Sequence, residues 1–102
     1  MIRHSVLVRF RPDLPGKERL GIFVQLAALD GVVPGMLSFH AGENCSPEQL
    51  GRGYLHGFSI DFKDQAARDA YLVHPDHKAA GARLVNACLN GIDDILVFDL
   101  EL

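Results

Sequence analysis

Four segments of the chain show the hydrophobic pattern of β-strands. Residues 2–10 and 54–62 alternate with period two, residues 36–41 do so more weakly, and residues 95–98 form a short apolar run. In residues 2–10 and in residues 54–62 the even positions make the apolar face. These positions are Ile2, His4, Val6, Val8, Phe10, Tyr54, His56, Phe58, Ile60 and Phe62. Strict alternation predicts strands with one buried face.

Apolar residues recur at helical spacing between these strands. Residues 17–29 predict an amphipathic helix with an apolar stripe that includes Leu20 and Val24, ended by Asp30-Gly31. Asp64 is a suitable cap for a second helix that runs to about residue 73. His74-Pro75 must end that helix, because the residue before a proline avoids the α region, and Pro75 suits the first position of a third helix reaching residues 90–91.

The order strand, helix, strand, strand, two helices, strand predicts a ferredoxin-like α+β fold of the split βαββαβ type, with one domain over residues 1–102. In this fold the helices cover one face of an antiparallel sheet. The other face is bare, and an exposed apolar sheet face is normally covered by another subunit. We therefore expect a homodimer packed sheet against sheet. Residues 42–53, rich in Gly, Asn, Ser and Pro, predict a long loop suited to a lid or rim.

Charge, hydropathy and cysteine content indicate which partners and which compartment to expect. Ten basic and 13 acidic residues give a net charge of −3, which predicts no nucleic-acid partner. No apolar stretch is long enough to span a membrane, and Arg9 interrupts the first apolar run too early for a signal peptide. Cys45 and Cys88 fit neither a zinc nor a redox spacing. We expect a cytoplasmic protein with two reduced thiols.

Histidines and one tyrosine provide the candidate chemistry. His4 and His56 lie on the apolar faces of two strands that are central neighbours in a ferredoxin-like sheet, so their imidazoles are expected to lie close together. In the segment Tyr71-x-x-His74-Pro75-x-His77, His77 falls in the first turn of a helix, where the helix dipole disfavours imidazolium. A neutral imidazole is the form that a general base needs, and Tyr71 is placed to partner it or to donate to an oxyanion.

Metal and cofactor signals are weak by comparison. His74 and His77 are three residues apart, but the helix boundary between them aims their rings differently, and no His-Glu-x-x-His motif or paired carboxylate accompanies them. We interpret His74 as a helix-capping residue. The sequence has no glycine-rich phosphate loop and no serine elbow, so neither a metal nor a cofactor is predicted.

Several stretches together resemble the stress-responsive dimeric α/β-barrel (Dabb) domain family: residues 2–10, 33–36, 41–44, 53–56, the Tyr71-x-x-His74-Pro75-x-His77 segment and residues 97–99. The resemblance covers essentially the whole chain. It implies a ferredoxin-like subunit and a homodimer whose two sheets form a barrel. One enzyme of the family, plant olivetolic acid cyclase, performs a cofactor-free aldol cyclisation of a polyketide. Residues that match His77 and Tyr71 are its base and the partner of that base.

Residues that match His4 and His56 also occur in that cyclase. Its second pocket tyrosine is replaced here by Leu26, and this chain has no tryptophan to match the one near the end of the cyclase's last helix. The resemblance therefore implies the His77–Tyr71 pair more strongly than it implies polyketide cyclisation.

The sequence thus predicts a small carbonyl or phenolic ligand in an apolar pocket between sheet and helices. Cofactor-free proton abstraction or aldol-type chemistry would use His77 as base and Tyr71 as its partner or as a hydrogen-bond donor. The remaining pocket residues are His4, Val6, His56 and Phe58. Two alternatives remain open: a ligand-binding or stress protein without catalysis, and a relative of the haem- or oxygen-handling monooxygenases that share the fold.

Overall fold

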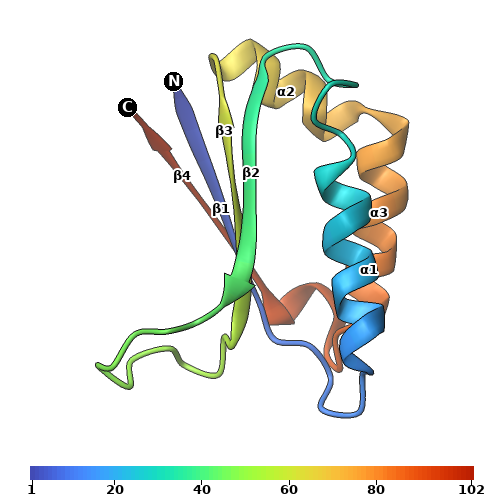
Figure 1. The fold of residues 1–102 in the computed structure, drawn as a ribbon, viewed down its shortest axis with the longest axis vertical. Coiled ribbons are helices and arrows are strands. Elements are labelled where there is room, and N and C mark those ends of the chain that lie inside the picture. The colour runs from blue at the N-terminus through green and yellow to red at the C-terminus, as the bar shows by residue number, and fades with distance from the viewer.

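The computed structural model describes residues 1–102 and consists of a four-stranded antiparallel sheet with helices on one face (Figure 1). The strands are β1 (Ile2–Val8), β2 (Met36–Glu43), β3 (His56–Phe62) and β4 (Ile95–Glu101); the helices are α1 (Gly16–Ala27), α2 (Gln65–Val73), α3 (Pro75–Asn86) and the short 3₁₀ helix η1 (Gly91–Asp94). The strand order β2-β3-β1-β4, with every neighbouring pair antiparallel, is that of the ferredoxin-like α+β fold. The predicted fold is confirmed.

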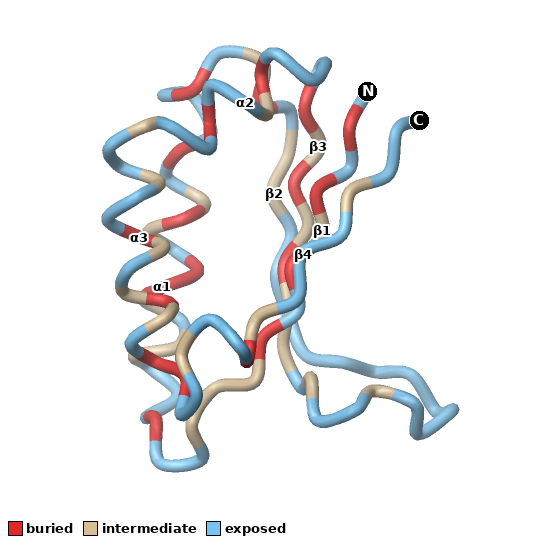
Figure 2. Tube along the Cα trace, turned by 180° about the vertical axis from the view of Figure 1, so that it is seen from behind, coloured by how far each residue is buried: buried red, intermediate tan, exposed pale blue.

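The core lies between the sheet and the helices. Figure 2 shows buried positions along the central strands β1 and β3, while β4 is largely exposed. In α1 the buried residues are Ile22, Phe23 and Leu26, whereas Leu20 and Val24 are 62% and 60% exposed. The predicted apolar stripe of α1 is therefore only partly the buried face. Apolar residues extend around more of this helix than the sheet covers, so spacing alone does not select the packed side.

The junction between α2 and α3 follows the predicted local signals. The Asp64 side chain caps α2 by accepting a hydrogen bond from the backbone N–H of Ala67 at 2.9 Å. His74 adopts an extended conformation, and its Nδ1 accepts from the N–H of Asp76 at 3.1 Å to cap α3. The capping role predicted for His74 is confirmed.

Helix α3 ends at Asn86, about four residues earlier than predicted. After it, the backbone pairs with the segment that follows β1: Phe10 bridges to Cys88, and Arg11 donates to the carbonyl of Ala87 at 2.9 Å. These contacts replace the hydrogen bonds that a longer helix would make.

The second face of the sheet has no cover within the chain. Exposed apolar side chains there include Leu7 of β1 and three of β4, namely Leu96, Phe98 and Leu100. Residues 44–55, which we name the hairpin arm, connect β2 to β3 and extend from the sheet on the side away from the helices (Figures 1 and 2). No helix is both long and apolar enough to cross a membrane.

Candidate functional site

Three of the predicted site residues meet where α2, α3 and β1 approach one another. The ring centre of Tyr71, near the end of α2, lies 4.3 Å from that of His77 and 5.9 Å from that of His4. Tyr71 is completely buried and also packs against Phe62 of β3. We name His4, Tyr71 and His77 the histidine–tyrosine cluster. It unites residues from three elements, so it depends on the tertiary fold.

His77 is held with one ring nitrogen free. Its Nδ1 lies 3.2 Å from the carbonyl oxygen of Leu72. A carbonyl can only accept a hydrogen bond, so Nδ1 carries the proton and Nε2 keeps its lone pair. Burial lowers the pKa of His77, nearby His4 and His74 lower it further, and the bond to Leu72 acts in the opposite direction. The ring is thus kept neutral, as a general base requires.

The hydroxyl of Tyr71 is buried and has no hydrogen-bond partner in the protein. Burial strongly raises the pKa of this phenol, so it keeps its proton at neutral pH. A neutral phenol is a hydrogen-bond donor and a weak acceptor. Such a group can donate to an oxygen atom of a ligand.

His4 belongs to a chain of charged contacts behind the cluster. Its Nδ1 lies 2.7 Å from Oδ1 of Asp99, and Oδ2 of Asp99 accepts from Nη1 of Arg68 at 3.0 Å. Sequence reasoning missed both Asp99 and Arg68. One signal was present: Asp99 is a carboxylate on the inward side of the last strand, and the β1–β4 register pairs it with His4. That register is a long-range property which local patterns do not reveal.

The other predicted residues lie elsewhere along the sheet. The β1–β3 register pairs His4 with Ile60 and His56 with Val8, four residues further on. At about 3.3 Å per residue this separates the two histidines by about 13 Å along the strands. The expectation that their imidazoles lie close together is wrong.

His56 instead packs against Phe10, with ring centres 5.6 Å apart, and Phe58 stacks on Phe39 at 5.5 Å. Val6 is buried in the core and lies opposite Phe58 in the β1–β3 register. Burial and the charge of Arg19 lower the pKa of His56, while Glu43, 3.9 Å away, raises it.

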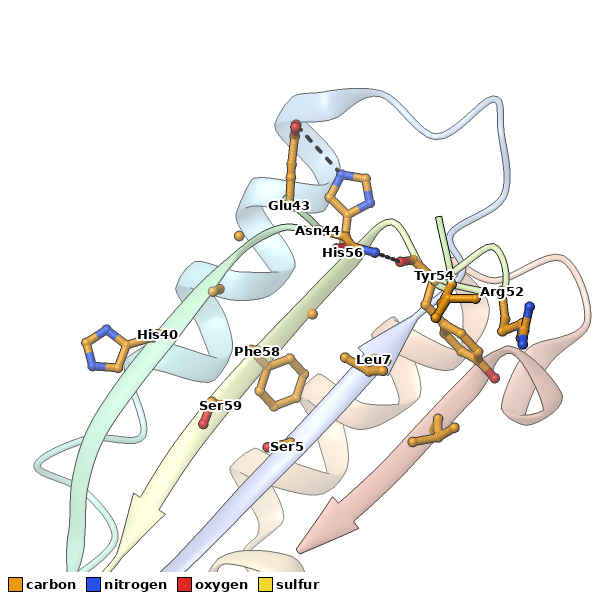
Figure 3. Close-up of a pocket in the computed structure, with 16 residues that line it drawn as sticks. Ser5, Leu7, His40, Glu43, Asn44, Arg52, Tyr54, His56, Phe58 and Ser59 are labelled. Atoms are coloured by element: carbon orange, nitrogen blue, oxygen red, sulfur yellow. Dashed lines mark hydrogen bonds and ion pairs between the residues drawn. The ribbon is translucent and has the colours of Figure 1, made fainter. Parts of the chain in front are cut away.

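A hollow of about 640 Å³ lies at the bare side of the sheet beside the hairpin arm (Figure 3). Its lining includes Ser5, Leu7, Tyr54 and Leu96. Of the predicted pocket residues it contains His56 and Phe58 and none of the other four. This hollow is therefore not the predicted pocket. No group of three or more His, Cys, Asp or Glu side chains is arranged to hold a metal ion.

A sheet with one helix-covered face and one bare apolar face is the subunit architecture of the dimeric ferredoxin-like proteins, and solved structures of that class match the fold. Residues 2–102 match the Stress responsive A/B Barrel Domain, or Dabb, and the chain belongs to this family. The resemblance seen in the sequence is confirmed.

Relatives come from bacteria and plants. A dimeric ferredoxin-like protein of unknown function from Jannaschia sp. CCS1 is 39% identical, with a TM-score of 0.92 over 99% of this chain and 98% of that one. The stress-response A/B barrel domain-containing protein HS1 of Arabidopsis thaliana is 28% identical over 98% of this chain and 88% of its own length. Hydroxynitrile lyase from Passiflora edulis, at 21% identity, shares the fold with a TM-score of 0.86 over 99% and 92% of the two chains.

Proposed function

We propose that the histidine–tyrosine cluster binds a small, uncharged carbonyl or phenolic compound and abstracts a proton next to its carbonyl group without a cofactor. The observation that carries the proposal is the buried, unpartnered hydroxyl of Tyr71 beside the neutral ring of His77. Leaving a buried hydroxyl unpaired costs about 1–3 kcal/mol. A donor kept free for a ligand explains that cost.

In the proposed step, Nε2 of His77 takes the proton from the carbon next to the carbonyl. The electron pair of that C–H bond moves into the C–C bond, and the carbonyl π pair moves onto oxygen to give an enolate. The hydroxyl of Tyr71 donates a hydrogen bond to this oxygen, which is worth more in a dry site than in water. Return of the proton from His77 to the enolate completes an isomerisation or exchange, and attack of the enolate on a second carbonyl gives an aldol product.

Access to the cluster involves the surface between α2 and α3. Tyr71 is completely buried, but His77 is half-buried and neighbouring Val73 is 67% exposed. A ligand reaches the hydroxyl when the His77 ring and the junction at His74-Pro75 move aside. The reverse movement then closes the site around the bound ligand and excludes water.

The test is exchange of carbon-bound protons for deuterium, followed by proton NMR on a panel of small ketones, β-diketones and acylphenols in deuterium oxide. A general base contributes about 10²–10⁴-fold to rate, so His77→Gln is expected to lose most of the exchange. Tyr71→Phe removes the donor and should lose about 10²-fold.

Tyr54→Phe is the matched control, because it removes the other phenol of the chain, which lies at the hairpin arm. This variant should exchange at the wild-type rate. Exchange that is catalysed equally well by wild type and His77→Gln would refute the assignment of the base.

We also infer that two copies of this chain pack through their bare sheet faces. Support comes from the apolar side chains Leu7, Leu96, Phe98 and Leu100, which no other part of the chain covers. The similar protein from Jannaschia sp. CCS1 is dimeric. In such a dimer the hollow beside the hairpin arm faces the second copy.

A second candidate function is ligand binding without catalysis. One observation favours it: the hollow beside the hairpin arm lies on the other side of the sheet from the histidine–tyrosine cluster, while Tyr71 is fully enclosed. This alternative predicts saturable chemical-shift changes around the hollow, with no deuterium exchange. The two functions are therefore distinguished by the same samples.

A further inference from the structure

The proposed chemistry leaves the charged contacts behind His4 without a role. We propose that Arg68 is a positioning residue, which acts through Asp99 to hold His4 in a single tautomer with Nε2 available to the ligand. The proposal rests on the proposed function of the histidine–tyrosine cluster and adds a residue to it. Nothing in the Tyr-x-x-His-Pro-x-His segment points to Arg68.

The contact with Asp99 determines which nitrogen of the His4 ring carries a proton. An ionised carboxylate can only accept hydrogen bonds, so at 2.7 Å from Asp99 the Nδ1 of His4 must carry a proton. A ring whose single proton is on Nδ1 has its lone pair on Nε2, and the structure has no hydrogen bond from Nε2 to another protein group. The side chain of His4 is only 5% exposed. A molecule bound beside the cluster can therefore donate a hydrogen bond to this nitrogen.

Asp99 is held in one orientation by contacts at both carboxylate oxygens. Its two oxygens face different partners, Oδ1 towards His4 and Oδ2 towards Arg68 at 3.0 Å. A carboxylate bound at both oxygens has one rotamer, whereas a carboxylate bound at one oxygen can turn. The Asp99 side chain is 23% exposed, so water would compete for it if the guanidinium were absent.

The guanidinium of Arg68 is itself fixed in position by two carboxylates. The Nε of Arg68 bonds to Asp69 at 3.0 Å while its Nη1 bonds to Asp99, so the planar guanidinium is fixed at two places. Two carboxylates also neutralise its charge. Arg68 is therefore not free to bind an anionic ligand, and the contact it offers the site is the one through Asp99.

A purely structural role must be distinguished, because Arg68 also joins α2 to β4. The structure offers a matched control in Gln65, one turn earlier on α2, which donates to Glu101 of β4 at 3.4 Å. Gln65→Ala removes a link between the same two elements without touching His4 or Asp99.

The experiment is nitrogen-15 NMR of the imidazole rings in the ligand-free protein, using the two-bond correlations that identify each tautomer. Wild type is expected to show His4 as the Nδ1–H tautomer alone. Arg68→Met should give a mixture of tautomers and at least about tenfold faster exchange of the Nδ1 proton with water, since a charge-assisted contact is lost. Arg68→Lys should keep part of the wild-type behaviour. Gln65→Ala should give the same His4 spectrum as the wild type.

The proposal is overturned if Arg68→Met leaves the His4 signals unchanged, or if Gln65→Ala alters them as strongly. Because the measurement needs no substrate, its outcome is separate from that of the deuterium-exchange test. Where exchange is measurable, Arg68→Met is expected to lower kcat/KM about tenfold with partial recovery in Arg68→Lys. A wild-type rate in Arg68→Met would show that the tautomer of His4 has no bearing on the reaction.

Discussion

At the scale of single residues, Tyr71 has two properties that rarely occur together. It lies at the centre of the packing between α2 and the sheet, and its hydroxyl is buried without a partner. The aromatic ring contributes to stability through contacts with Phe62 and His4. The hydroxyl oxygen does not contribute to stability, and we propose that it binds a ligand.

Tyr71→Phe is accordingly expected to leave the free energy of unfolding unchanged or to raise it by about 1 kcal/mol, because an unsatisfied polar atom is removed and the ring is retained. Urea unfolding of wild type and variant measures the difference. Tyr54→Phe, at the hairpin arm, should change nothing. A loss of 1 kcal/mol or more in Tyr71→Phe would mean that the hydroxyl is hydrogen-bonded in solution.

His77 links the site to pH. The pKa of His77 is lower in the folded protein than its ordinary value of 6.5. In the unfolded chain His77 therefore binds a proton near pH 6.5, where the folded chain does not yet bind it. As pH falls from 6.5 towards the folded pKa, the unfolded state binds more protons and stability declines. Thermal unfolding between pH 7 and about pH 5 should show this decline.

His77→Gln is expected to make that decline shallower. A remaining slope is expected from His56, whose pKa is also lowered by burial, and His56→Gln should remove that share. Identical slopes in wild type and His77→Gln would contradict the burial of a neutral His77 ring.

Local patterns were sufficient for part of this site and insufficient for the rest. The Tyr71-x-x-His74-Pro75-x-His77 segment predicted two helix termini that bring Tyr71 and His77 together, and the structure has their rings 4.3 Å apart. The partners of His4 were not predictable in this way. Asp99 is 95 residues away along the chain and meets His4 only through the β1–β4 register.

At the scale of elements, the termini of helices were more predictable than their buried faces. Asp64 and His74 cap α2 and α3 through hydrogen bonds that span two or three residues, so the sequence itself contains the signal. The buried face of α1 depends on where the sheet lies. Its apolar residues surround more than half of the helix, and only the fold decides that Leu26 is buried and Val24 is exposed.

The turn between α1 and β2 offers a test of how tightly α2 packs against that turn. Gly31 and Gly35 have φ values of +89° and +87°, which L-residues adopt at a cost of about 1–2 kcal/mol. A Cβ at Gly31 would meet open space, whereas at Gly35 it would lie 2.6 Å from the Cβ of Ala67 in α2. Gly31→Ala should therefore lose about 1–2 kcal/mol of stability, and Gly35→Ala about 1–3 kcal/mol more.

Both glycine variants are compared by urea unfolding at one protein concentration. Equal losses would mean that α2 shifts away without cost and that its contact with this turn is loose. Such a shift would also move Tyr71, which lies on the same helix, so the comparison bears directly on how firmly the site is held.

At the scale of the whole molecule, the chain leaves one side of its sheet unfinished. The helices bury the inner faces of β1 and β3, and the outer side carries a row of apolar residues along β4. Arg9 fixes the base of the hairpin arm through two contacts. Its guanidinium lies 4.9 Å from the ring centre of Tyr54, and one of its nitrogens lies 2.9 Å from the carboxylate of buried Asp94. An arm held in this way has a defined direction before any second copy arrives.

This arrangement predicts that the proposed dimer depends on the bare face and not on exposed leucines in general. Leu96→Lys places a charge among Leu7, Phe98 and Leu100, and each copy would bring its own lysine to a twofold interface. Burying such charges without partners costs several kcal/mol each, so we expect the wild type to form the proposed dimer and the variant to be monomeric. Sedimentation velocity between 1 and about 100 µM, the range in which moderately tight dimers dissociate, measures the change.

Leu20→Lys is the matched control, because Leu20 is 62% exposed on α1 and lies on the helical side of the molecule. It should leave the dimer intact. If Leu20→Lys dissociated the dimer and Leu96→Lys did not, the two copies would meet through their helices. The hollow beside the hairpin arm would then be open to solvent in the dimer, which would favour that hollow as the binding site in place of the histidine–tyrosine cluster.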